Sequence, residues 1–185
     1  MPDDAALLVV LESLRDRGAL GEPSLPSAIA HAEAFLAPLT PDTQRLIDLG
    51  SGGGLPGLVL ADRLPSTEIL LTERRQRRAD LLRLAVSRLG WQDRVTVFAG
   101  DVVRLGQDPA IAATFDAVTA RAFGEPLWTL RCAAPFLVSS GIVVISEPPD
   151  SDPGRRWPID QVNGLGLAPA DPDDFPFVRC FRQMR

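Results

Sequence analysis

Leucine and other apolar positions near the start of the chain recur at intervals typical of helices. The first leucines lie three or four residues apart and Gly18 follows them, which predicts a helix over 5–17. A second stretch of helical spacing covers 27–39, with Ser27 as the expected N-cap. We therefore expect residues 1–44 to form a short helical extension at the N-terminus.

Short apolar runs alternate with helical patterns along the rest of the chain. Strands are predicted over 45–49, 68–72, 94–98, 115–121 and 141–146. Helices are predicted over 58–64, 76–89 and 128–137. Two further strands, 162–167 and 175–181, are expected to pair antiparallel at the sheet edge. This alternation implies right-handed βαβ crossovers, and so an α/β fold with a mostly parallel seven-stranded sheet and helices on both faces.

The length of the chain and its few metal-binding side chains limit the classes of protein it can belong to. Its 185 residues suit one domain, which we expect to extend over 1–185. No stretch approaches the roughly 18 apolar residues of a membrane span, so we expect a cytoplasmic protein that does not contact membranes. We also expect it to be a monomer. Cys132 and Cys180 form no CxxC pair and His31 is the single histidine, so neither a disulfide framework nor a metal site is expected.

Arginine supplies all 19 basic residues, and the chain has neither lysine nor tyrosine. A lysine Schiff base, a lysine general base and a tyrosine acid are therefore excluded. Because the net charge is −5, binding to DNA is not expected and any contact with RNA must use a local basic patch. The arginine-rich stretch 74–88 either contacts phosphates or forms the solvated face of an amphipathic helix.

A glycine-rich run, 48–57, follows the first predicted strand. Gly50, Gly52 and Gly54 allow the backbone to turn tightly and allow a ligand to approach the main chain. The spacing fits two classes of cofactor, NAD and S-adenosyl-L-methionine. Asp48 favours the second, because a carboxylate there repels a pyrophosphate and attracts a cationic amino-acid group.

Two more acids follow the next two predicted strands. Glu73 closes the second strand, where a carboxylate can accept hydrogen bonds from the ribose hydroxyls of either cofactor. Asp101 follows the third strand, where it either reaches an adenine amino group, with Val102 against the ring, or caps a turn. Because ligands of such sheets bind outside the carboxyl ends of the strands, Asp48, Glu73 and Asp101 together predict one nucleoside site.

The run 48–57 and the sequence Thr-Ala-Arg-Ala-Phe at 119–123 together resemble the RsmG (GidB) family, which methylates N7 of a guanine in bacterial 16S ribosomal RNA. The resemblance covers roughly 45–146. It implies a Rossmann-like class I methyltransferase fold, S-adenosyl-L-methionine as the cofactor, and 16S ribosomal RNA or the small ribosomal subunit as the partner. It implies cofactor contacts at Gly50, Leu55, Glu73, Asp101, Val102 and Arg121. It also implies that Arg121 faces the substrate as the catalytic residue.

The chemistry of this reaction suits the side chains that the chain has. Guanine N7 carries an in-plane lone pair and no proton at neutral pH, so methyl transfer to it requires positioning more than a general base. A site without lysine can therefore perform the reaction.

The chain departs from the pattern of that family in several places. Glu147 follows the fifth strand where the family carries Lys-Gly, Ala30-His31 stands in place of Arg-His, and fewer residues precede the first motif. Phe175-Pro176-Phe177 occupies the stretch where the family's C-terminal strand begins with arginine. Three alternatives therefore remain open: a non-catalytic module that binds the cofactor and an RNA or protein, a small-molecule methyltransferase, and an NAD-dependent oxidoreductase.

Overall fold

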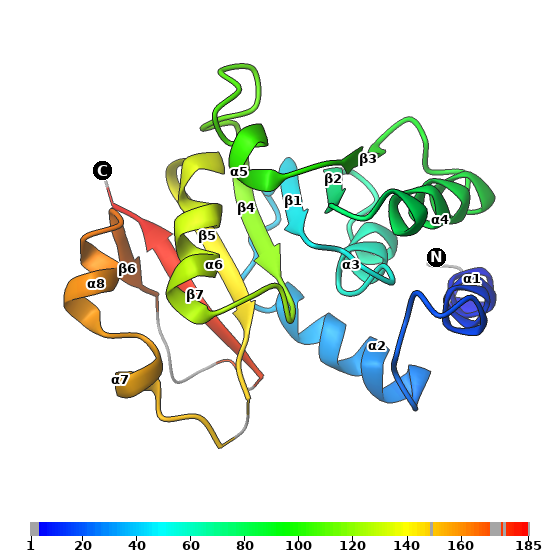
Figure 1. Ribbon diagram of the computed structural model, residues 1–185, viewed down its shortest axis with the longest axis horizontal. Helices are drawn as coiled ribbons and strands as arrows, with labels where there is room; N and C mark the ends of the chain where they lie inside the picture. Colours follow the sequence, from blue (N-terminus) through cyan, green and yellow to red (C-terminus); the bar gives the residue numbers. More distant parts are fainter. Residues whose placement is uncertain (1–3, 149, 171–174, 176, 185) are drawn as a thin grey trace.

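The computed structural model of the protein describes residues 4–148, 150–170, 175 and 177–184. Within them, seven strands form one sheet in the order β3-β2-β1-β4-β5-β7-β6 (Figure 1). The strands are β1 (Arg45–Leu49), β2 (Glu68–Glu73), β3 (Val95–Ala99), β4 (Phe115–Ala120), β5 (Leu137–Ser146), β6 (Leu167–Pro169) and β7 (Val178–Gln183). β1 to β5 run parallel, whereas β7 lies antiparallel to both β5 and β6. The predicted mostly parallel sheet is confirmed, as is its antiparallel edge.

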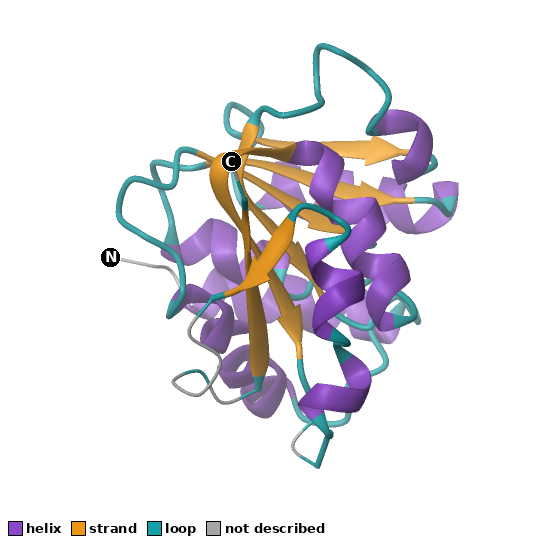
Figure 2. Cartoon of the chain, turned by 90° about the vertical axis from the view of Figure 1, so that its left-hand side faces the viewer, coloured by secondary structure: helices purple, strands orange, loops and turns teal. Residues whose placement is uncertain are grey.

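Helices cover both faces of this sheet, as predicted (Figure 2). They are α1 (Asp4–Asp16), α2 (Leu25–Glu33), α3 (Gly57–Arg63), α4 (Gln76–Arg88), α5 (Val102–Leu105), α6 (Pro126–Ala133), α7 (Pro153–Arg156) and α8 (Ile159–Asn163), with short 3₁₀ turns at Ala34–Leu36 and Ala134–Phe136. Buried residues of α1 to α4 share one core on one face, and those of α5, α6 and α8 share a second core on the other. The sheet therefore separates two hydrophobic cores.

The central strand β1 is buried on both faces. Leu46 and Ile47 are both fully buried, yet Leu46 belongs to the core under α1 to α4 and Ile47 to the core under α5, α6 and α8. Side chains of a strand alternate between faces, so a strand covered by helices on both sides needs apolar residues at successive positions. This requirement explains the continuous apolar run that marks β1 in the sequence.

Two predicted segments were wrong in detail. The second helix begins at Leu25, and Ser24 rather than Ser27 is its N-cap, because the Ser24 hydroxyl accepts a hydrogen bond from the backbone N–H of Ser27 at 3.4 Å. The predicted strand 162–167 is instead mostly the end of α8 and a turn, since Val162 and Leu165 are spaced for a helix.

Two further boundaries differ from the prediction. The helix predicted over 128–137 ends at Ala133, and the fifth strand begins at Leu137, four residues earlier than expected; Pro135 lies in the 3₁₀ turn between them. The last predicted strand, 175–181, is observed at Val178–Gln183, and its Pro176 lies outside the described residues.

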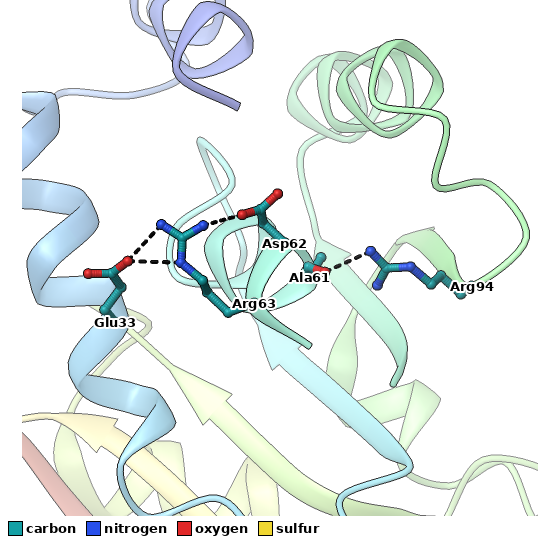
Figure 3. A network of polar contacts seen from close by, with 5 residues as sticks. All are labelled: Glu33, Ala61, Asp62, Arg63 and Arg94. Atoms are coloured by element: carbon teal, nitrogen blue, oxygen red, sulfur yellow. Dashed lines mark hydrogen bonds and ion pairs between the residues drawn. The ribbon is translucent and has the colours of Figure 1, made fainter. Parts of the chain in front are cut away.

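Arg63 at the end of α3 joins the N-terminal helices to the sheet domain. Its guanidinium donates two hydrogen bonds to Glu33 Oε1 on α2, at 2.9 and 2.8 Å, and also pairs with Asp62 (Figure 3). Arg94, before β3, also reaches α3, where its guanidinium donates a hydrogen bond of 2.7 Å to the Ala61 carbonyl. Leu7 and Phe35 are buried in the same core as Leu46. The N-terminal helices are thus part of the core that supports β1.

The connection between α1 and α2 packs directly on the glycine-rich loop after β1. A Cβ added to Gly53 would lie 2.7 Å from the Ala19 carbonyl oxygen and 2.7 Å from Leu20 Cβ. Glycine at this position therefore allows two backbone segments to touch, and the loop is covered on that side.

Gly53→Ala should separate these two segments and destabilise the protein. The added methyl group meets backbone atoms, which cannot rotate away, so we expect a loss of about 1–3 kcal/mol in the free energy of unfolding. Urea denaturation measures this loss. Gly21→Ala is the matched control in the same connection, because a Cβ there meets nothing within 4 Å. Equal stability of the two variants would show that the close packing of Gly53 on the connection between α1 and α2 does not contribute to the free energy of unfolding.

Candidate functional site

The carboxyl ends of β1 to β4 open into a cleft of about 590 Å³. Four of the residues predicted from the sequence line it together: Gly50, Glu73, Asp101 and Val102. Phe123, Trp128 and Cys132 line it as well, and sequence reasoning did not identify these three residues as part of a site. Trp128 is exposed in the structure, and a tryptophan close after a helix N-cap was the sequence signal that could have indicated this wall of the cleft.

The two acids of the cleft are held by backbone hydrogen bonds. Glu73, at the end of β2, is buried, and its Oε1 accepts a hydrogen bond of 2.7 Å from the backbone N–H of Arg75. Asp101 is the N-cap of α5, and its Oδ1 accepts a hydrogen bond of 2.8 Å from the backbone N–H of Val103. Asp101 therefore both caps α5 and lines the cleft, so the two alternatives considered for it hold together.

The glycine-rich loop turns under an aromatic ring. Gly50 has a φ of +66°, and a Cβ there would lie 2.7 Å from Phe123 Cδ2. Its N–H donates to the Thr72 hydroxyl at 3.1 Å, and the N–H of Ser51 donates to the Thr72 carbonyl at 2.7 Å. The turn after β1 is thus fixed to β2, with its backbone at the cleft wall.

The remaining residues predicted in this loop do not line the cleft. Gly52 has a φ of +54°, and Gly54 lies against the side chain of Leu58. Leu55 is buried in the core. The structure therefore brings Gly50 to the cleft and places Gly52, Gly54 and Leu55 behind it or beside it.

Asp48 lies below the loop and is fully buried. Its Oδ1 accepts a hydrogen bond of 2.7 Å from the Thr119 hydroxyl on β4, whereas its Oδ2 lies against Gly57 at the start of α3, whose backbone N–H also favours the ionised carboxylate. Burial raises the pKa of Asp48 to about 6, and the nearby hydroxyls of Ser51 and Thr119 limit the rise. Asp48 is thus a buried carboxylate that supports the site from beneath without lining the cleft.

Arg121 follows β4 and does not line the cleft either. Its guanidinium forms an ion pair with Glu22, from the connection between α1 and α2. His31 on α2 lies close by, and burial together with the charge of Arg121 lowers the pKa of its imidazole. Glu22 is a partner that sequence reasoning missed, because it lies 99 residues away from Arg121 in the chain.

Glu147 takes part in an internal network. The side chain is buried, and it accepts a hydrogen bond of 2.8 Å from Trp157 Nε1 and another from the Ser151 hydroxyl. Arg156 Nε lies 3.5 Å from the same carboxylate. Glu147, which stands where the family carries lysine, therefore fixes the segment after β5 and presents little negative charge to a ligand.

The two cysteines are free and buried, as expected of core thiols. Burial raises the pKa of Cys132, in the cleft wall, to about 11, so its thiol is protonated at neutral pH and is a poor nucleophile. Among the described residues, no three His, Cys, Asp or Glu side chains gather as metal ligands. In the same part of the chain, every helix is too short or too polar to cross a bilayer.

The strand order, the loop after β1 and the acids after β2 and β3 define a class I methyltransferase fold. An O-methyltransferase from Bacillus cereus, solved in complex with SAH, superposes with a TM-score of 0.69 over 100% of this chain and 93% of its own, at 15% identity. The cofactor-bound protein Rv0187 from MTB superposes with a TM-score of 0.69 over 99% of this chain and 91% of its own, at 20% identity. The Rossmann-like fold expected from the sequence is confirmed.

The family is defined by the sequence comparisons. The family model of GidB, rRNA small subunit methyltransferase G, matches residues 23–147, and the chain belongs to this family. Over 101 residues it is 42% identical to the ribosomal RNA small subunit methyltransferase G of Sorangium cellulosum, covering 55% of this chain and 41% of that protein. Over 111 residues it is 41% identical to the protein of the same name from Acidothermus cellulolyticus, covering 60% and 47%. The matches thus span less than half of these relatives.

Asp48→Asn should remove a pH dependence of stability. The native state binds the Asp48 proton more tightly than the unfolded chain does, since the pKa is about 6 instead of 3.8. Wild-type stability should therefore fall as the pH rises from about 4 to about 6, by about 3 kcal/mol in total, and stay reduced above that range. The variant should lack this fall.

Urea denaturation at a series of pH values measures the effect as the difference between wild type and variant. Asp160→Asn, at an exposed position on α8, is the control and should keep the wild-type profile. A profile for Asp48→Asn that parallels the wild type would contradict the burial of an ionisable carboxylate below the loop.

Proposed function

We propose that this chain is an S-adenosyl-L-methionine-dependent methyltransferase that transfers a methyl group to N7 of a guanine in 16S ribosomal RNA. One observation carries the proposal: a chain of the rRNA small subunit methyltransferase G family has both Glu73 and Asp101 in the lining of a cleft at the ends of its parallel strands. We further propose that it acts as a monomer in the cytoplasm on the small ribosomal subunit.

The cleft provides groups suited to the adenosine half of the cofactor. The Glu73 carboxylate is held in a fixed orientation and would accept hydrogen bonds from the ribose hydroxyls. Asp101 would accept from the adenine amino group, with Val102 against the ring. The backbone at Gly50, and the aromatic ring of Phe123 packed on it, would form the opposite wall.

Asp48 supports a positively charged ligand above the loop. Its carboxylate is fully buried and burial raises its pKa to about 6, so a nearby positive charge would favour its ionised form. A cationic methionine portion held beside Gly50, on the cleft side of the loop, fits this requirement, whereas the pyrophosphate of NAD would be repelled. Leu55, in the core behind the loop, would hold the loop in place.

Arg121 is our candidate for the residue that orients the acceptor. When bound, the cofactor supplies an electrophilic methyl group on a positively charged sulfur. The guanine N7 lone pair needs no base to attack it, so the chain has to hold the acceptor in line. Arg121 follows β4, near the loop, and its partner Glu22 keeps the guanidinium oriented.

Glu73→Gln should weaken binding of S-adenosylhomocysteine about 10- to 100-fold, which is the usual cost of losing hydrogen bonds to a charged group. Isothermal titration calorimetry measures this loss. Glu68→Gln is the matched control, because Glu68 lies at the other end of the same strand, exposed and paired with Arg45. Wild-type protein that binds NAD but not S-adenosylhomocysteine would overturn the proposal.

Arg121→Gln should lower kcat/KM for methylation of small subunits that lack this methyl group about tenfold or more, while affinity for S-adenosylhomocysteine changes less. Transfer of a radiolabelled methyl group measures the rate. Arg155→Gln is the matched control, since it removes the same charge from an exposed arginine on α7 that does not line the cleft, and it should retain activity.

Two results would change the assignment. If Arg121→Gln keeps full activity, Arg121 has no role in orienting the acceptor. If the wild type binds S-adenosylhomocysteine but methylates no ribosomal RNA, the protein is a cofactor-binding module or a methyltransferase for small molecules.

A further inference from the structure

Among the described residues, four arginines near the cleft have no acidic partner, whereas five arginines elsewhere form ion pairs. Arginines paired with carboxylates are Arg45, Arg63, Arg83, Arg121 and Arg156. No carboxylate among the described residues pairs with Arg17, Arg75, Arg77 or Arg78. Other arginines of the described residues, such as Arg104 and Arg131, also form no ion pair, but Arg17, Arg75, Arg77 and Arg78 are gathered around one hollow.

These four side chains line one hollow of about 260 Å³. Arg17 comes from the end of α1, and the other three come from the start of α4, with Leu81 on the wall between them. α1 and α4 lie at the same end of the molecule (Figure 1). Asp80, the acid of this part of α4, is engaged by Gln76 and Arg83. The hollow is thus lined by positive charge, in a protein whose net charge is −5.

Four like charges around one hollow repel each other unless an anion lies between them. Arginine is suited to phosphate in particular, because its planar guanidinium donates two parallel hydrogen bonds to two oxygens. Water and salt screen part of this repulsion at the exposed Arg17, Arg75 and Arg77, and a phosphate-rich ligand in the hollow would remove more of it.

The hollow lies next to the cleft, because the two share lining residues. Arg75 and Arg78 line both, whereas Arg17 and Arg77 line the hollow alone. A chain of phosphates that follows the arginines from α1 along α4 would therefore end beside the glycine-rich loop. This arrangement suits a polymer that delivers one of its bases to the cleft.

We propose that the hollow binds the phosphodiester backbone of the RNA substrate, with Arg17 and Arg77 as phosphate contacts outside the cofactor cleft. The inference rests on the proposed function for the identity of the polymer. It adds a surface, formed by α1 and α4, that positions the RNA next to the site of methyl transfer.

The test is the double variant Arg17→Gln/Arg77→Gln, titrated with a fluorescein-labelled single-stranded RNA oligonucleotide at several salt concentrations. Loss of two phosphate contacts should reduce the slope of log K against log salt by about 1.4 and weaken binding about tenfold or more at 0.1 M salt. Affinity for S-adenosylhomocysteine should stay unchanged, because neither residue lines the cleft. Circular dichroism checks that the variant is folded.

Arg131→Gln/Arg155→Gln is the matched control. It removes the same net charge from two exposed arginines, on α6 and α7, and should keep the wild-type RNA affinity. Equal losses in both double variants would overturn the proposal, because net charge alone would then explain them. An unchanged salt slope in Arg17→Gln/Arg77→Gln would also overturn it, as would displacement of the RNA by polyglutamate at equal charge concentration. A wild type that binds RNA but not S-adenosylhomocysteine would instead refute the proposed function.

Discussion

The hydrogen bond from the Thr119 hydroxyl to the buried carboxylate of Asp48 joins the carboxyl ends of the two central strands, β1 and β4. It lies beneath the glycine-rich loop, and the same loop is tied to β2 through Thr72. A carboxylate without access to water raises the free energy of the folded protein when it is ionised. A positively charged ligand held above the Asp48 carboxylate would offset this cost in free energy.

Partners within the protein also decide which charged side chains remain free to contact a ligand. Glu22 pairs with Arg121, and the buried Glu147 is enclosed by Trp157, Ser151 and Arg156, so two acids that could repel RNA are engaged by partners within the protein. Among the described residues, the arginines near the start of α4 have no such partners. A protein that is acidic as a whole can therefore carry a strongly basic region, and net charge is a poor guide to its ligand.

Hydrophobic spacing was sufficient to predict the strands β1 to β5 and the helices α3, α4 and α6, because a sheet covered on both faces requires continuous apolar runs. It failed at 162–167, where Val162 and Leu165 fit a helical interval within a short segment rich in polar residues and glycine. It also missed α5, whose four residues are too few to form a periodic pattern. The sequence predicted Asp101 as a candidate site residue and the structure places it in the cleft lining, but its capping hydrogen bond to Val103 required the structure.

The sequence by itself determined the fold class, the glycine-rich turn and the acids after the first three strands, because these depend on local spacing and on which residues tolerate a tight turn. Only the tertiary structure decided that Asp48 lies beneath the cleft while Glu73 and Asp101 line it. It also decided that Phe123 and Trp128 form the other wall, and that Arg121 pairs with Glu22. These are contacts between segments far apart in the chain, and no periodicity within one segment encodes them.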